Sequence, residues 1–428
     1  MTGVRLKVDR FVIDGGRRLD GEIVVQGAKN AVLPILAATV LNGGKNVIHN
    51  CPGLRDVEKT VSVLEGLGCK VTKQGRTLIV DSSYVNDCRI DESLMRQMRS
   101  SIIFLGAIIG RLGEAIVSMP GGCEIGARPI DLHLKALKQL GITINESHGY
   151  IYCKADKLVG SDIHLDFPSV GATENVMLAA VLAEGITTIS NAACEPEISD
   201  LQNFLNRMGA KVIGAGGSTI RIEGVKHLYG VDHTIMPDRI AAATYLACGA
   251  ATGGRITLKN ANPADMTAIL NALHEMGVKF FTEKDTIYSV SPKKLRAVRA
   301  VRTMPYPGFP TDFQSPFLAL CAISSGTSIL TETIFENRFQ NVEELNRMGA
   351  NIKVDGRTAV IIGVDSLSGA NVFARELRGG ASLIVAGLFA NGVTNISNIE
   401  YIDRGYEDIE KNLSACGANI QRVETEVN

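Results

Sequence analysis

One motif occurs six times along the chain, and this repetition constrains the fold more than any other feature. Each copy has a leucine, three further residues and a glycine, followed by a short apolar stretch; the glycines are Gly68, Gly141, Gly209, Gly277, Gly349 and Gly417. They lie 68 to 73 residues apart. Similarity at a fixed period is typical of folds built from repeated structural units. The 428 residues therefore predict six similar repeats.

Every repeat shows the same predicted order of elements. An apolar helix comes first and ends at a glycine, which suits the left-handed backbone after a helix. A short strand, a variable loop and an amphipathic second helix follow, and most repeats close with a hairpin pattern. The predicted first helices span residues 30–43, 100–113, 172–185, 239–253, 313–326 and 379–392. This order predicts an α/β protein.

The sixth repeat is one strand short after Ile420, and the N-terminal segment offers a candidate. Residues 11–13 match the strands at 220–222 and 360–362 in their distance from the next helix start. We therefore expect the N-terminal segment to complete the last repeat.

This completion makes one domain discontinuous. We expect one domain to combine residues 1–28 and 238–428, with repeats four to six, and the other to span residues 29–237, with repeats one to three. The chain would cross between them near Lys29 and Pro237.

Composition excludes several functional classes. Lys and Arg number 44 against 45 Asp and Glu, whereas dedicated nucleic-acid binders carry a basic excess. Aromatic residues make up only 5% and Trp is absent, which disfavours a platform of stacking rings. No apolar stretch reaches the length of a membrane-spanning helix, and no secretory signal opens the chain.

The cysteines and histidines form no metal-binding or disulfide pattern. The nine cysteines are scattered, without a C-x-x-C pair or a Cys/His cluster. Free thiols and the lack of a leader indicate the cytoplasm. We expect no metal and no cofactor, and we expect His133 to be structural.

Charged residues recur where the first helices begin. Lys29, Arg99, Asp312 and Arg378 occupy equivalent positions in their repeats. A cation there opposes the helix dipole, so an anionic ligand is a reasonable compensation. The alternative is a solvated surface cation, the usual state of Lys and Arg.

Two further residues have features of catalytic groups. Cys123 is preceded by two glycines and followed five residues later by Arg128, a setting that lowers a thiol pKa. The alternative is a small buried hydrophobe, as we expect for the other eight cysteines. Asp312 follows Pro310 at a helix start, where an acid is usually a cap. Its equivalence to Lys29 makes it a candidate general base.

Seven motifs resemble those of the enolpyruvyl transferase family, in particular the members that act on UDP-N-acetylglucosamine. They lie at residues 27–31, 98–102, 120–129, 169–173, 309–312, 335–339 and 402–407. The match runs through all six repeats. The resemblance implies an inside-out α/β barrel fold, with two domains that each hold three repeats about a pseudo-threefold axis.

The resemblance also implies a reaction. Enolpyruvate would pass from phosphoenolpyruvate to the 3-hydroxyl of UDP-N-acetylglucosamine by addition and elimination through a tetrahedral ketal, with release of phosphate. This is the first committed step of peptidoglycan synthesis, and so serves cell-wall biogenesis, cell shape and division. The partners would be these two small molecules, without nucleic acid or membrane insertion, and a monomer fits.

Residue roles follow from the resemblance motif by motif. Cys123 would protonate the enolpyruvyl methylene and be the target of fosfomycin, and Asp312 would take the proton of the sugar hydroxyl. Lys29, Arg128 and Arg404 would hold phosphoenolpyruvate. The remaining contacts would come from Arg99, Arg338 and Arg378 to further anionic groups, from Asn30 and Ile334 to the sugar, and from Arg128, Pro129, Ile130, Asp131, Leu132, Ser169, Val170 and Gly171 to the uridine diphosphate.

The sequence departs from the family pattern at two positions and leaves two alternatives open. Ile103 stands where some members have Trp, and Glu376 stands where many have Asp, which leaves its role open. One alternative is the sister enzyme that acts on shikimate 3-phosphate, and the loop around Cys123 argues against it. The other is an inactive paralogue that binds the nucleotide sugar, and the retained Lys29 and Asp312 argue against that.

Overall fold

The computed structural model describes residues 6–119 and 130–427, which form two compact units. Unit 1 contains the described residues up to Gln26 and those from Pro237 onward, and unit 2 contains those from Gly27 to Met236. The chain passes between the units at 26/27 and 236/237, next to the crossings expected near Lys29 and Pro237. Each unit is described by itself below.

Unit 2 is built from the first three repeats. Its elements are α1 Lys29–Ala38, β3 Lys45–His49, α2 Arg55–Gly66, β4 Lys70–Gln74, β5 Thr77–Asp81, α3 Glu92–Gln97, η1 Arg99–Ile103, α4 Phe104–Leu112, β6 Glu114–Ser118, α5 Asp131–Gln139, β7 Thr143–Ser147, β8 Tyr150–Lys154, β9 Asp162–His164, α6 Val170–Ala180, β10 Ile186–Ser190, α7 Pro196–Arg207, β11 Lys211–Ile213, β12 Thr219–Glu223 and β13 Asp232–Thr234.

Unit 1 joins the N-terminal segment to the last three repeats. Its elements are β1 Leu6–Asp14, β2 Asp20–Val24, α8 Arg239–Ala251, β14 Arg255–Lys259, η2 Pro263–Met266, α9 Thr267–Glu275, β15 Lys279–Glu283, β16 Thr286–Val290, β17 Ala300–Arg302, α10 Thr311–Ala322, β18 Thr327–Thr331, α11 Val342–Arg347, β19 Asn351–Asp355, β20 Thr358–Ile362, β21 Asn371–Phe373, α12 Leu377–Phe389, β22 Val393–Ser397, η3 Ile399–Arg404, α13 Ile409–Ala415 and β23 Asn419–Val427.

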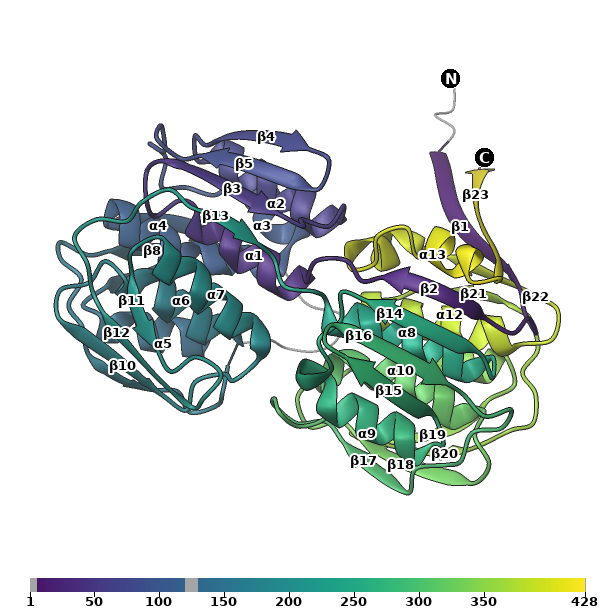
Figure 1. The fold of residues 1–428 in the computed structure, drawn as a ribbon. Coiled ribbons are helices and arrows are strands. Elements are labelled where there is room, and N and C mark those ends of the chain that lie inside the picture. The colour runs from purple at the N-terminus through teal and green to yellow at the C-terminus, as the bar shows by residue number, and fades with distance from the viewer. Residues whose placement is uncertain (1–5, 120–129, 428) are drawn as a thin grey trace. The chain divides into compact units, whose positions relative to one another are not determined.

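Within each unit the first helices of the repeats form the core and the sheets lie outside them. In unit 1, α8, α10 and α12 pack pairwise against one another at the centre (Figure 1). In unit 2, α1 and α6 each pack against α4. Every residue of α8 is buried. Helices that are apolar all round belong in a core, whereas the strands alternate between buried and exposed residues. This is the helices-inside arrangement that the resemblance implied.

The N-terminal strand completes the sixth repeat, as expected. The sheet order there is β21-β22-β1-β23, with Phe11 opposite Ile396 and Ile13 opposite Ile420. The segment also contributes β2, which pairs in parallel with β14 of the fourth repeat. The strand before α8, β13, pairs instead with β3 of the first repeat. The two crossings thus exchange the edge strands of repeats one and four.

The glycines that end the helices have the backbone conformation that the sequence predicts. All twelve have φ between +57° and +117°. The distance between the helix end and its glycine differs among the repeats: α1 ends at Ala38 and the chain reaches Gly43 through a turn, whereas α4 ends at Leu112, directly before its cap Gly113. The predicted end was therefore several residues too late for α1 and correct to one residue for α4.

Glu174 is a carboxyl group buried within α6. Glu174 is only 5% exposed, and Glu195 and Glu197 lie near its carboxyl group. Burial raises the pKa of Glu174 well above its ordinary value, and the two neighbouring acids raise it further. Glu174 is therefore protonated in the folded protein at a pH where an exposed Glu is ionised.

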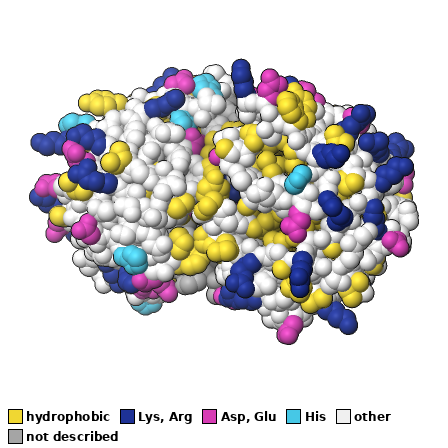
Figure 2. Space-filling model, turned by 60° about the horizontal axis from the view of Figure 1, so that its bottom comes forward, with side chains coloured by type: hydrophobic (Ala, Val, Ile, Leu, Met, Phe, Trp, Pro, Cys, Tyr) yellow, Lys and Arg dark blue, Asp and Glu magenta, His cyan; other side chains and the backbone are white. Residues whose placement is uncertain are grey.

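No described helix has the length and apolar character needed to cross a bilayer. The eight described cysteines are free, and six of them are buried. Burial raises the pKa of Cys51, Cys69 and Cys153 to about 12. These thiols are inert hydrophobes, as expected. Cationic and acidic side chains are interspersed on the face shown in Figure 2.

We predict that the same Gly→Ala change has opposite effects at two glycines of unit 2. A Cβ at Gly224 would overlap the carbonyl oxygen of Ala183, so Gly224→Ala should destabilise the protein by about 2 kcal/mol. Gly66 closes α2 with open space around it, so Gly66→Ala should stabilise by about 0.5 kcal/mol. Urea unfolding measures both changes, and equal effects would contradict this packing.

A second prediction concerns Glu174→Gln and pH. Because the folded state holds Glu174 protonated, its stabilising contribution is complete below the unfolded pKa of about 4.3 and is lost as pH rises. Glu174→Gln should therefore unfold at a higher temperature than the wild type at pH 8, with the gap closing near pH 4. Exposed Glu146→Gln is the control and should show no such pH-dependent gap. A variant no more stable than wild type at pH 8 would refute the prediction.

Candidate active site

The residues predicted from the sequence lie mostly where helices begin. In unit 2, Lys29 opens α1, Asp131 opens α5 and Val170 opens α6. In unit 1, Asp312 lies in the first turn of α10, and Arg378 lies in that of α12. Backbone N–H groups at a helix start attract anions. Both units therefore contribute termini that suit anionic substrates.

Part of the predicted site lies outside the described residues. Cys123, Arg128 and Pro129 are among these, and for Arg99 the structure describes the backbone at the start of η1 but not the side chain. Their roles rest on the sequence alone.

Lys29 is a buried cation held by a buried acid. The residue is 8% exposed, and its Nζ lies 2.8 Å from Oδ2 of Asp56 in the first turn of α2. The alternative of a solvated surface cation is therefore wrong for Lys29. The carboxylate fixes the ammonium group at the start of α1, beside Asn30. Sequence reasoning missed Asp56.

The two segments implied for uridine diphosphate come together in unit 2. Helices α5 and α6 pack together, and a Cβ at Gly171 would lie 2.8 Å from Cε1 of His133, one turn after Ile130. The Asn175 amide nitrogen lies 2.8 Å from His133 Nδ1 and donates to the Ile102 carbonyl. His133 thus has the structural role expected of it. Its contact with Gly171 brings Ile130, Asp131 and Leu132 close to Ser169 and Val170.

Asp312 is held between two buried guanidinium groups. Oδ1 accepts from Nη2 of Arg338 at 2.9 Å, and Oδ2 accepts from Nη2 of Arg378 at 3.3 Å. Both arginine side chains are 3% exposed, whereas that of Asp312 is 27% exposed. The cap of α10 is Pro310, so Asp312 is not the cap residue. The arrangement orients an accessible carboxylate, as a general base requires.

Arg378 is fixed by an aromatic partner that sequence reasoning did not single out. Its Nη1 donates to the Tyr406 hydroxyl at 3.1 Å, its guanidinium lies 5.5 Å from the ring centroid, and Thr244 Oγ1 lies 2.9 Å from the same hydroxyl. Burial raises the pKa of Tyr406, partly offset by the neighbouring Arg378, so the hydroxyl stays neutral. Tyr406 follows Arg404, which ends η3.

Glu376, whose role the sequence left open, is the cap of α12. Its carboxylate accepts from the backbone N–H of Arg378 at 2.8 Å and from that of Gly379. Oε2 also lies 3.8 Å from Nη1 of Arg338. The acid therefore both caps the helix and lies beside the arginine pair around Asp312.

A second acid that sequence reasoning missed links the Ile334 loop to α10. The Glu332 carboxylate is buried and accepts from the Thr303 hydroxyl at 2.8 Å and the Thr311 hydroxyl at 2.9 Å. It also accepts from the backbone N–H of Ile334 at 2.8 Å and of Phe335 at 3.1 Å. Four donors satisfy a buried carboxylate without a cation. Ile334 is thereby fixed beside the turn that carries Asp312.

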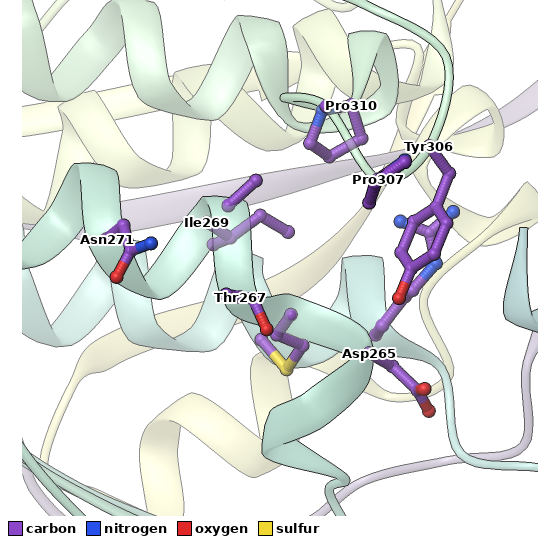
Figure 3. Close-up of a pocket in the computed structure, with 11 residues that line it drawn as sticks. Asp265, Thr267, Ile269, Asn271, Tyr306, Pro307 and Pro310 are labelled. Atoms are coloured by element: carbon purple, nitrogen blue, oxygen red, sulfur yellow. The ribbon is translucent and has the colours of Figure 1, made fainter.

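Unit 1 also holds a cavity of about 320 Å³ next to the start of α10. Figure 3 shows Tyr306, Pro307 and Pro310 facing residues of η2 and α9 across it. The Arg239 guanidinium lies 5.4 Å from the centroid of the Tyr306 ring in its wall. None of the predicted site residues that the structure describes lines this cavity.

No group of three or more His, Cys, Asp or Glu side chains within residues 6–119 and 130–427 is arranged to hold a metal ion. The chemistry of the described site is that of fixed cations, helix termini and one oriented carboxylate.

Known proteins resemble this chain along nearly its whole length. The family model described as EPSP synthase (3-phosphoshikimate 1-carboxyvinyltransferase) matches residues 13–413. UDP-N-acetylglucosamine 1-carboxyvinyltransferase 2 of Caldanaerobacter subterraneus subsp. tengcongensis is 56% identical over 97% of this chain and 99% of its own. UDP-N-acetylglucosamine 1-carboxyvinyltransferase 1 of Symbiobacterium thermophilum is 52% identical over 97% of this chain and 95% of its own.

Solved structures show the same fold. The enolpyruvyl transferase NikO from Streptomyces tendae superposes with a TM-score of 0.88 at 24% identity, over 98% of this chain and all of that one. EPSP synthase from Acinetobacter baumannii gives a TM-score of 0.74 at 17% identity, over 97% of this chain. The family model is described by the sister reaction, but the relatives of this chain at about half identity or more are named for the nucleotide sugar. The chain belongs to the enolpyruvyl transferase family and, within it, to the UDP-N-acetylglucosamine 1-carboxyvinyltransferases of peptidoglycan synthesis.

Proposed function

We propose that the described residues divide the work of this enolpyruvyl transfer between the two units. One observation carries the proposal: Asp312 is an accessible carboxylate that Arg338 and Arg378 fix at a helix start. A carboxylate so oriented can take the proton of the sugar 3-hydroxyl while the oxygen attacks C2 of phosphoenolpyruvate. Cys123 gives a proton to the methylene carbon, which completes the tetrahedral ketal. In the elimination, the resulting methyl group returns a proton to the Cys123 thiolate while the bond from C2 to the phosphate oxygen breaks, so phosphate leaves and the double bond of the enolpyruvyl ether forms.

The cations serve to bind two polyanionic substrates. Lys29, Arg128 and Arg404 hold the carboxylate and phosphate of phosphoenolpyruvate, and Arg99, Arg338 and Arg378 provide further positive charge. Charge-assisted hydrogen bonds to fixed donors are stronger than neutral ones, and they stabilise charge that develops during the reaction. The Lys29–Asp56 contact supports this role because it presents the ammonium in a set orientation.

The acceptor occupies the starts of α5 and α6 in unit 2 and the Ile334 loop in unit 1. Residues Arg128 to Leu132 and Ser169 to Gly171 hold the uridine diphosphate, while Asn30 and Ile334 contact the sugar. The packing of His133 on Gly171 supports the first assignment, because it brings the two segments together. We expect the reaction to take place in the cytoplasm, in a chain that works as a monomer without a cofactor.

The two units serve as the two domains of this enzyme. We assign residues 1–28 and 238–428 to one and residues 29–237 to the other.

A phosphate-release assay tests the proposed substrates. With phosphoenolpyruvate present, the chain should release phosphate when UDP-N-acetylglucosamine is added and not when shikimate 3-phosphate is added. Release with shikimate 3-phosphate alone would assign the chain to the sister reaction. No release with either acceptor would mean an inactive paralogue.

Asp312→Asn tests the base. Asparagine keeps the size of the side chain but cannot take up a proton, so kcat should fall by roughly 100-fold or more. Asp365→Asn in the same unit is the matched control: its fully exposed carboxylate pairs only with Lys294 among the ion pairs seen, and kcat should stay unchanged. Turnover by Asp312→Asn at the wild-type rate would remove Asp312 from this role.

A further inference from the structure

Gln26 bonds to two distant segments of unit 1. It follows β2, is 3% exposed and is the last residue before the first crossing. Its backbone carbonyl accepts from the N–H of Asp238 at 2.9 Å. Its side-chain Oε1 accepts from the N–H of Glu407 at 2.8 Å, and Nε2 donates to the Gly405 carbonyl at 3.1 Å. The residue therefore ties β2 to the start of α8 and to the loop that follows η3.

This loop is continuous with the predicted phosphoenolpyruvate site. Arg404 immediately precedes Gly405, and Tyr406 lies between the two backbone groups that Gln26 binds. The Tyr406 hydroxyl reaches Arg378, whose Nη2 reaches Asp312. The amide of Gln26 thus holds the backbone on both sides of Tyr406, and the Tyr406 side chain is linked through Arg378 to the proposed base.

Few side chains could replace Gln26 here. The loop presents one partly buried donor, the N–H of Glu407, and one buried acceptor, the Gly405 carbonyl, and a buried backbone group without a partner is costly. A primary amide offers an acceptor and a donor at one planar end, whereas a carboxylate offers only acceptors and a thioether offers no donor and only a weak acceptor. The amide satisfies both groups and fixes the turn between them.

We propose that Gln26 is a positioning residue for phosphoenolpyruvate, acting through the conformation of residues 404–407. The inference rests on the proposed role of Arg404. Without the amide, this loop would lose its fixed geometry and Arg404 would meet its substrate in many orientations. The nucleotide-sugar segments lie on other elements and would keep theirs.

Gln26→Met tests this by preserving volume while removing both hydrogen bonds. The KM for phosphoenolpyruvate should rise about tenfold, as expected for a misplaced binding group, while the KM for UDP-N-acetylglucosamine changes less than about twofold. A general loss of stability would lower the active fraction without separating the two KM values. An unchanged KM for phosphoenolpyruvate would overturn the proposal.

Gln26→Glu adds a second test, because a merely structural role of Gln26 would not make the KM for phosphoenolpyruvate depend on pH. A protonated carboxyl has the same donor and acceptor as the amide, but an ionised one lacks the donor. The ratio of the KM for phosphoenolpyruvate in Gln26→Glu to that in the wild type should be close to one at low pH and should rise as pH increases. The nearby titratable groups Asp238, Arg378, Tyr406 and Glu407 are the same in both proteins, so the ratio isolates position 26. A ratio independent of pH would count against the proposal.

Asn260→Gly is the matched control. The Asn260 amide donates to the Val25 carbonyl at 2.9 Å, one residue before Gln26, and its φ of +53° suits glycine. It should leave both KM values unchanged, and a rise in the KM for phosphoenolpyruvate equal to that of Gln26→Met would overturn the specific role. Wild-type enzyme in the same assay separates the two proposals: its inactivity would refute the proposed function, whereas active wild type with an unaffected Gln26→Met refutes only the positioning role.

Discussion

The burial of the first helices on all sides is the constraint on which the rest of the structure depends. Because α8 and its counterparts are surrounded by apolar contacts, they leave only their ends for polar chemistry. The helix starts carry unpaired N–H groups that favour anions. Three of the residues proposed to act on the two anionic substrates, Lys29, Asp312 and Arg378, lie at these starts. The two cations among them are fixed by buried partners, Lys29 by Asp56 and Arg378 by Tyr406.

The features that recur within the sequence could be predicted from it. The regular spacing of the motif glycines predicted the six repeats, and each of these glycines has the positive φ expected after a helix. The spare strand at residues 11–13 was identified because it matches two others in spacing, and it pairs within the sixth repeat. Turn chemistry and hydrophobic periodicity depend on only a few neighbouring residues. A pattern found in one repeat therefore predicts the same local structure in the others.

The partners of the site residues could not be predicted in this way. Glu332 satisfies groups from three segments, Gln26 bonds to a loop nearly four hundred positions further along, and β2 joins the sheet of the fourth repeat. These contacts occur once and depend on which segments the tertiary fold brings together. Nothing in the spacing around Glu332 or Gln26 distinguishes them from solvated polar residues. Their roles become visible only in the structure, where both side chains are buried and bond to groups from distant segments.

The exchange of edge strands has a consequence for how the protein is made. The described residues of unit 2 all lie between Gly27 and Met236, and the two ends of this stretch meet: the N–H of Ala28 donates to the carbonyl of Met236 at 2.7 Å, and β13 pairs with β3. It can therefore close as soon as β13 has left the ribosome, since domains fold as units during synthesis. Strands β1 and β2 must wait unpaired through that time, because their partners β14, β22 and β23 are synthesised after unit 2. Strand β2 can pair once β14 has emerged, whereas β1 stays unpaired until β22 and β23 are made. An unpaired strand edge is a site of aggregation, so this interval is when the nascent chain is most exposed to it.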